Sequence, residues 1–153
     1  MATIQKFEDL ICFSKSRELT KTVYFYLKNC KDNGFKDQIT RASVSVMSNI
    51  AEGFERGTKQ EFLNYLYIAK GSAGEVRAQL YVAFDAGYLN MEKFKYLNSK
   101  AIECSKLIQS FAEKVKKGAS GGTQFKKIEK EDPMKEILRQ RSLELYKRFY
   151  GDS

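Results

Sequence analysis

The chain has 153 residues and a formal net charge of +8, and hydrophobic residues make up 42% of it. This length fits one domain with a buried core, and a single proline with ten glycines excludes collagen-like or proline-rich disorder. No apolar run approaches the roughly 18 residues that a membrane span needs, and the first residues lack the apolar stretch of a signal peptide. We therefore expect a soluble, cytoplasmic protein that does not enter a membrane.

Two features of residue usage exclude most site chemistries. The sequence has no histidine, which rules out histidine-containing triads, histidine general bases and histidine metal sites. Its cysteines, Cys12, Cys30 and Cys104, are far apart and form no CxxC pair, as expected for reduced, packed thiols rather than a zinc site or a disulfide framework. We expect no enzyme activity, no catalytic residue, no metal and no cofactor.

Four segments carry apolar residues at alternating steps of three and four, a spacing that traces one stripe along an α-helix. The first two stripes run through residues 12–30 and 39–53. The other two run without a break through residues 59–86 and 92–117. No segment shows a sustained alternation of period two. The pattern therefore predicts four helices and essentially no β-structure.

Turn and capping residues separate these segments. Residues 32–34 (Asp-Asn-Gly) follow the first stripe, and Thr58 opens the third segment with Glu61 at the capping-box position. Asn90 is placed to cap the fourth segment. Loops this short make neighbouring helices antiparallel. The sequence thus predicts an all-α fold, an up-down-up-down four-helix bundle over residues 1–117.

The composition changes after this bundle. Residues 118–132 begin with Gly-Ala-Ser-Gly-Gly and are expected to form a flexible linker. Asp132 followed by Pro133 is typical of a helix start, because proline is tolerated at the first helical position. Residues 133–153 carry apolar side chains on one face and basic ones elsewhere, which predicts a C-terminal basic amphipathic helix.

The excess of positive charge is greatest near the C-terminus. Residues 114–153 contain 11 basic and 6 acidic residues, so they contribute +5 of the total charge. Such a balance fits a polyanion such as RNA or DNA, whose phosphates it would neutralise, although a solvated lysine-rich surface is the alternative. Aromatic residues interleave with the basic ones here, an arrangement that favours stacking on bases. The candidate nucleic-acid-binding residues are Lys114, Lys116, Lys117, Lys126, Lys127, Arg139, Arg141, Lys147 and Arg148.

A polar stripe accompanies the apolar one on the second segment. Folding the chain about the turn at 57–58 pairs positions whose numbers sum to about 115, which brings Arg41 near Glu75. A polar layer inside the bundle explains these residues, because buried charges must be paired. A carboxylate–amide–guanidinium site is the functional alternative, but no nucleophile with a neighbouring base is visible. We predict an Arg41–Glu75 ion pair within a structural polar layer of Arg41, Asn49, Glu52, Arg56 and Glu75.

The run SNIAEGFERGTKQEFLNYLYIAKGSAGEVRAQL (48–80) resembles the four-helix-bundle family encoded by intervening sequences in bacterial 23S ribosomal RNA genes. That family is similar to the accessory variability determinant of diversity-generating retroelements. The resemblance covers residues 4–117 and implies a homo-oligomer, a pentamer around a central pore, with nucleic-acid binding and no known enzymatic activity. The residues that carry it are Gln38, Arg41, Ala42, Ser48, Asn49, Ile50, Ala51, Glu52, Gly53, Arg56, Phe62, Ala69, Gly71, Ser72 and Glu75.

Two functions remain open. The first is a homo-oligomeric module that binds nucleic acid, with RNA foremost, as an accessory factor to a retroelement reverse transcriptase. The second is a protein-interaction scaffold whose C-terminal helix docks on a partner or on a neighbouring subunit. A contact surface between copies is also indicated, because five aromatic residues exceed what one stripe can bury: Tyr24, Phe25, Tyr65, Tyr67 and Tyr81.

Overall fold

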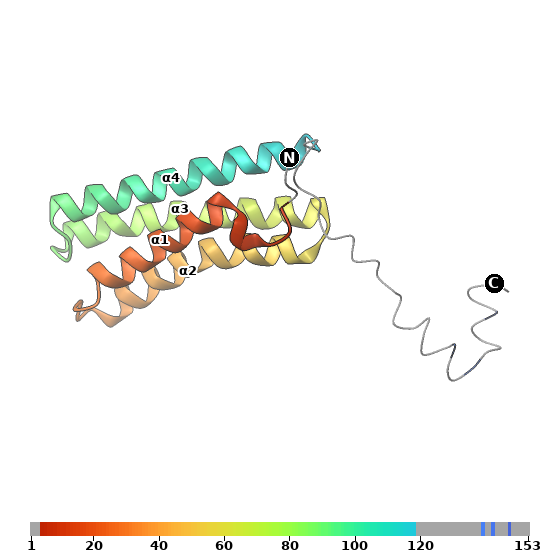
Figure 1. Cartoon of the computed structure of the whole chain (residues 1–153). Coiled ribbons are helices and arrows are strands. Elements are labelled where there is room, and N and C mark those ends of the chain that lie inside the picture. The colour runs from red at the N-terminus through yellow and green to blue at the C-terminus, as the bar shows by residue number, and fades with distance from the viewer. Residues whose placement is uncertain (1–3, 119–138, 140–141, 143–146, 148–153) are drawn as a thin grey trace.

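The computed structural model of this chain describes residues 4–118 together with residues 139, 142 and 147. It contains a short 3-10 helix, η1 (Phe7–Asp9), and four α-helices: α1 (Ile11–Tyr26), α2 (Asn33–Arg56), α3 (Lys59–Asp85) and α4 (Met91–Lys116) (Figure 1). No strand occurs among the described residues, so the predicted all-α four-helix bundle is confirmed. No helix in the same part of the chain is both long enough and apolar enough to cross a membrane. The predicted linker and almost all of the predicted tail helix lie outside the described residues.

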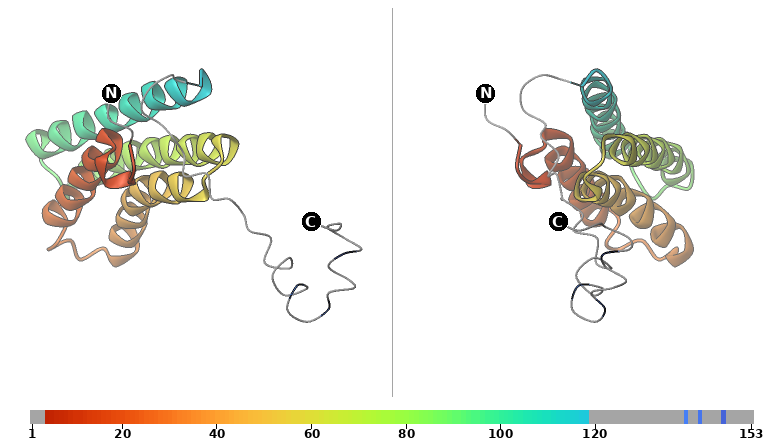
Figure 2. Two further views of the ribbon diagram at one scale, coloured as in Figure 1. Left: turned by 45° about the vertical axis from the view of Figure 1, so that its right-hand side comes forward. Right: turned by 90° about the vertical axis from the view of Figure 1, so that its right-hand side faces the viewer.

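Each helix packs against the next in the chain, and α1 closes the bundle by packing against α4. In two views α3 lies between α2 and α4, while α1 lies across α2 and α4 (Figures 1 and 2). The helices α1 and α3 are not neighbours. This arrangement leaves one side of α3 facing away from the rest of the bundle.

Local sequence explains where the helices begin and end. Asp32, Thr58 and Asn90 cap α2, α3 and α4, each accepting a hydrogen bond from the backbone N–H three residues later. Each cap satisfies one amide of a first turn, which has no partner within its own helix. The helix α2 ends at Gly57, whose φ of 81° lies in the left-handed region that glycine adopts without strain.

One cap also ties together the two loops at the same end of the bundle. The second carboxylate oxygen of Asp32 accepts a hydrogen bond of 2.7 Å from the Tyr88 hydroxyl, and the Tyr88 ring lies 5.4 Å from that of Phe35. The Phe35 amide and then the Tyr88 hydroxyl hold the pKa of Asp32 below its usual value. The connection between α1 and α2 is thereby joined to the connection between α3 and α4.

The predicted stripes form the core. Every predicted stripe residue on α3 is fully buried, and the stripes on α2 and α4 are buried along nearly all of their length. The stripe on the first segment is shorter than predicted, because α1 ends at Tyr26 and Cys30 lies half-buried beyond it. The largest fully buried side chains are Leu19, Val23, Leu27, Ile39, Val46, Ile50, Phe62, Leu66, Val76, Leu80, Leu97 and Ile108.

Two of the three thiols belong to this core, which leads to a prediction. Burial raises the pKa of Cys12 to about 12 and that of Cys104 to about 11, whereas Cys30 is only half-buried. Because the thiolate is the reactive form, we expect a disulfide reagent such as DTNB to modify Cys30 first and the other two only on unfolding. Titration of native and denatured protein measures this order. Rapid reaction of all three thiols in the native protein would contradict the packing described.

Candidate nucleic-acid interface

Positive charge is distributed unevenly over the four helices. The helix α1 has three basic residues and one acidic, and α4 has six basic and three acidic. The helices α2 and α3 each have three of either kind. The excess on helices is therefore +5, all of it on α1 and α4, which pack against each other. The helices α2 and α3 are each neutral by this count.

The structure places three of the candidate nucleic-acid-binding lysines together. They are exposed at the C-terminal end of α4, where the helix dipole favours positive charge. These residues are Lys114, Lys116 and Lys117. Arg139 and Lys147 are also exposed. Lys126, Lys127, Arg141 and Arg148 lie outside the described residues. A role for these nine residues in binding remains a prediction.

Three further lysines lie at the junction of α1 and α4, and a fourth follows α1 and lies over a ring of the same groove. We call these four the seam lysines: Lys21, Lys28, Lys93 and Lys100. Lys21 and Lys100 line a shallow groove there, and the ammonium group of Lys93 lies over the ring of Tyr26 on α1. Lys28, just beyond α1, lies over the ring of Phe25. These residues were not predicted from the sequence, because charge counted by stretch of chain does not reveal which helices pack together. A count by helix points to them.

The residues that line this groove include one carboxylate, that of Glu18. Glu18 accepts hydrogen bonds from the ammonium groups of Lys15, at 3.3 Å, and Lys100, at 3.4 Å. The bonds from Lys15 and then Lys100 hold the pKa of Glu18 below its usual value. Glu18 therefore stays ionised and is matched by two cations, so that it does not cancel the charge of the remaining seam lysines.

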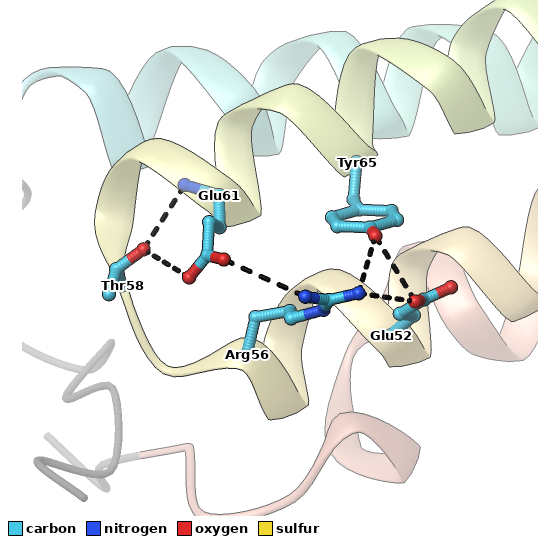
Figure 3. A network of polar contacts seen from close by, with 5 residues as sticks. All are labelled: Glu52, Arg56, Thr58, Glu61 and Tyr65. Carbon is cyan, nitrogen blue, oxygen red and sulfur yellow. Dashed lines mark hydrogen bonds and ion pairs between the residues drawn. The ribbon is translucent and has the colours of Figure 1, made fainter. Parts of the chain in front are cut away.

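The predicted polar layer is on the surface rather than inside the bundle. The side chains of Glu52 and Arg56 are each about half exposed. Figure 3 shows their contacts: an Arg56 nitrogen lies 3.1 Å from a Glu52 oxygen and 3.0 Å from the Tyr65 hydroxyl, which in turn donates to Glu52 at 3.1 Å. The prediction of a buried layer is wrong here, because these residues lie on the flank of α2 and not on its core-facing stripe.

The network continues into the turn between α2 and α3. The second guanidinium nitrogen of Arg56 lies 3.8 Å from one carboxylate oxygen of Glu61. The other oxygen of Glu61 accepts a hydrogen bond of 2.8 Å from the Thr58 hydroxyl (Figure 3). The guanidinium carbon of Arg56 lies over the Tyr65 ring, 5.4 Å from its centre. These contacts join the end of α2 to the first two turns of α3. We call this surface network of Glu52, Arg56, Thr58, Glu61 and Tyr65 the clasp.

The predicted Arg41–Glu75 ion pair is not formed. The Arg41 Nε donates at 2.8 Å to Asp37, one turn earlier on the same helix, and both of those side chains are exposed. Arg41 and Glu75 nevertheless line the same shallow hollow of about 350 Å³ between α2 and α3. The folding register was thus predicted correctly, and the partner was not.

Asn49 is the half-buried member of the predicted layer. Its amide nitrogen donates to the backbone oxygen of Ser45 at 2.7 Å and to the Ser45 hydroxyl at 2.9 Å. That hydroxyl also bonds to the hydroxyl of Ser72 on α3, at 2.9 Å. These three residues form a small polar bridge between α2 and α3, which is a packing role.

The clasp leads to a prediction about acid stability. The Arg56 and then the Tyr65 hydrogen bonds hold the pKa of Glu52 below its usual value, so the folded state keeps Glu52 ionised where the unfolded chain, with a pKa of about 4.3, binds a proton. This stabilisation is present above that pH and is lost as the pH falls through the lower, folded pKa. In Glu52→Gln we therefore expect the free energy of unfolding to fall less on acidification from neutral pH than in the parent. Urea unfolding across the acid range measures this, and identical losses would contradict the assignment.

No group of His, Cys, Asp and Glu side chains in the described part of the chain is arranged to hold a metal ion. The hollows there are shallow and open, and the described titratable groups that depart from their ordinary pKa values are ion pairs, hydrogen-bonded groups at caps and loops, or buried thiols.

Comparison with known proteins agrees with this architecture. A solved structure from Bacteroides thetaiotaomicron, described as a protein of unknown function from the S23 ribosomal protein family, is similar at 27% sequence identity with a TM-score of 0.63. The match covers 67% of this chain and 99% of that one. No curated protein matches the sequence. The family model of the 23S rRNA-intervening sequence protein matches residues 8–110, and the chain therefore belongs to that family.

Proposed function

We propose that this protein is a non-enzymatic, homo-oligomeric, cytoplasmic bundle that binds nucleic acid, RNA foremost, through the basic side formed by α1 and α4. The separation of charge carries the proposal: all of the net positive charge on the helices belongs to α1 and α4, and none belongs to α2 and α3. Such a surface attracts phosphates and gains affinity from the release of their counterions. The family description, which refers to sequences intervening in 23S rRNA, supports an association with RNA.

The outer face of α3 supports self-association. This face carries a second apolar stripe, opposite the buried one, whose members are Tyr67, Ile68, Gly71, Gly74, Ala78, Tyr81 and Val82. The four large side chains in it are between 45% and 54% exposed. A helix that is apolar on opposite faces is typical of a helix covered on both sides. A second copy of this chain is the occupant that we propose for this face.

Small residues make the centre of this stripe accessible to another helix. A Cβ atom added at Gly71 or at Gly74 would meet nothing within 4 Å, so the backbone there is open to close approach. Glycine inside a helix costs about 1 kcal/mol relative to alanine, and close packing against a neighbouring copy would compensate for that cost. Five copies, as the family resemblance implies, would carry five times the charge, so that weak single sites add up to useful avidity.

The retroelement setting is the finer part of the proposal. A sequence-tolerant RNA-binding oligomer is suited to hold a template for a reverse transcriptase, which would then be its protein partner. The alternative function is a scaffold on which the C-terminal segment docks against a partner or a neighbouring subunit. The two differ in what the segment 118–153 contributes to RNA binding.

Deletion of residues 118–153 tests the proposal against this alternative. The protein should bind RNA at low salt, and log affinity should fall linearly with log salt concentration, with a slope set by the number of phosphates neutralised. Truncation should make this slope shallower and reduce affinity without abolishing binding, because the basic side of α1 and α4 remains. Filter binding of both proteins across a salt series measures this. If neither protein binds RNA at low salt, the proposed function is wrong. Equal slopes for the two proteins would show that residues 118–153 do not contribute phosphate contacts.

A further inference from the structure

Three aromatic rings form a continuous row across the junction of α1 and α4. The Phe25 and Tyr26 ring centres are 5.9 Å apart, and those of Tyr26 and Tyr96 are 6.1 Å apart. Phe25 is 60% exposed and Tyr96 is 45% exposed. The row therefore joins two helices at the surface rather than filling the core.

Each ring of the row has a lysine ammonium group over it. Lys28 lies 4.6 Å from the centre of Phe25, Lys93 lies 5.2 Å from Tyr26, and Lys100 lies 5.5 Å from Tyr96. These are cation–π distances. Each ring of the row is thus paired with one positive charge.

The row lines an open groove that can admit a chain-like ligand. Phe25, Tyr26 and Tyr96 form it together with Lys21, Lys100 and two polar residues, and its volume is about 620 Å³. This falls within the range of about 300–1,000 Å³ that is typical of ligand sites. Its one carboxylate, Glu18, is already matched by Lys15 and Lys100. The groove is thus apolar along its rings and positive at its edges.

We propose that this row is a stacking platform for unpaired nucleotides of a single-stranded nucleic acid, with the seam lysines holding the phosphates. Bases present a π face whatever their identity, and a flexible single strand can offer bases to the rings and phosphates to the lysines beside them. A duplex keeps its bases stacked inside and offers only phosphates to the same surface. The inference rests on the nucleic-acid binding proposed above and names the form of nucleic acid that this side selects.

Fluorescence anisotropy with the full chain tests the platform, using a labelled oligouridylate and an RNA duplex of the same length. Phe25→Ala and Tyr96→Ala should each weaken oligouridylate binding roughly five- to hundredfold, the range for loss of one stacked base. Duplex affinity and the salt slope should not change, because no charge is removed. Tyr96→Phe should retain binding, since it keeps the ring.

Tyr24→Ala is the matched control, because Tyr24 is an exposed ring on the same helix that lines a different hollow. It should leave both affinities unchanged, and circular dichroism should show all variants folded. Unaltered oligouridylate binding in both platform variants, or an equal loss for duplex and single strand, would overturn the platform and leave the proposed function standing. Loss of self-association in place of RNA affinity would also overturn it. Failure of the parent protein to bind either RNA at low salt would instead refute the proposed function itself.

Discussion

Replacing Gly53 with alanine is expected to destabilise the bundle by about 1–2 kcal/mol. A Cβ atom at this position would lie 2.5 Å from the Cβ of Tyr65 and 3.0 Å from a ring carbon of Phe62, both on α3. The position of a Cβ atom is set by the backbone, so α2 and α3 must move apart. Overpacking of this kind costs about 1–3 kcal/mol or somewhat more, against a gain of about 1 kcal/mol in helix propensity.

Gly34→Ala provides a control in the same helix. An added Cβ there meets only a carboxylate oxygen of Asp32, at an ordinary contact distance of 3.7 Å, and the backbone is not in the left-handed region. Its stability should be unchanged or slightly raised. Urea unfolding of the two variants gives the comparison. Equal stability of Gly53→Ala and the parent would show that α2 and α3 are not in close contact at this point.

Introducing a charge at Ala78 is expected to convert the proposed oligomer into monomers. Ala78 lies near the middle of the outer stripe of α3 and is exposed in the single chain, so Ala78→Arg should fold normally. In an assembly that covers the stripe, the guanidinium would be buried without a partner, which costs several kcal/mol at each interface. Light scattering at micromolar concentration should show an oligomer for the parent and a monomer for the variant.

Ser14→Arg is the control for this experiment, since Ser14 is exposed on α1 and lies far from the outer stripe of α3 in the bundle. It adds the same charge and should leave the oligomer intact. A monomeric parent would contradict self-association altogether. Persistence of the oligomer in Ala78→Arg would place the interface elsewhere than on α3.

The helices could be predicted from sequence because their signals are local. The apolar steps of three and four mark each core stripe, and the caps Asp32, Thr58 and Asn90 form their bonds within one helical turn. The register of α2 against α3 also followed from the short turn: Gly53 faces Phe62, and Ser45 bonds to Ser72. In each case the interacting residues are close in the sequence or joined by a short turn, so few arrangements of the chain were possible.

The polar contacts were less predictable because nearby partners compete with distant ones. Arg41 bonds to Asp37 on its own helix, where little side-chain entropy is lost, instead of reaching across to Glu75. Glu52 and Arg56 lie on a polar stripe, and whether such a stripe faces the core or solvent depends on how far α3 overlaps the flank of α2. The seam lysines lie on or just after α1 and on α4, which are far apart in the sequence, so only the folded bundle brings them together.

Two charge-matched triple variants test whether the α1/α4 side binds nucleic acid. The first variant replaces three seam lysines with glutamine: Lys21, Lys28 and Lys93. The second replaces three basic residues of α3 with glutamine: Lys59, Lys70 and Arg77. If the seam lysines contact phosphates, the first variant should bind single-stranded RNA more weakly, with a salt slope shallower by about 2. The second variant, with the same loss of charge, should keep a slope close to that of the parent. Equal slopes for the two triple variants would contradict binding by the α1/α4 side, because net charge alone would then explain the affinity.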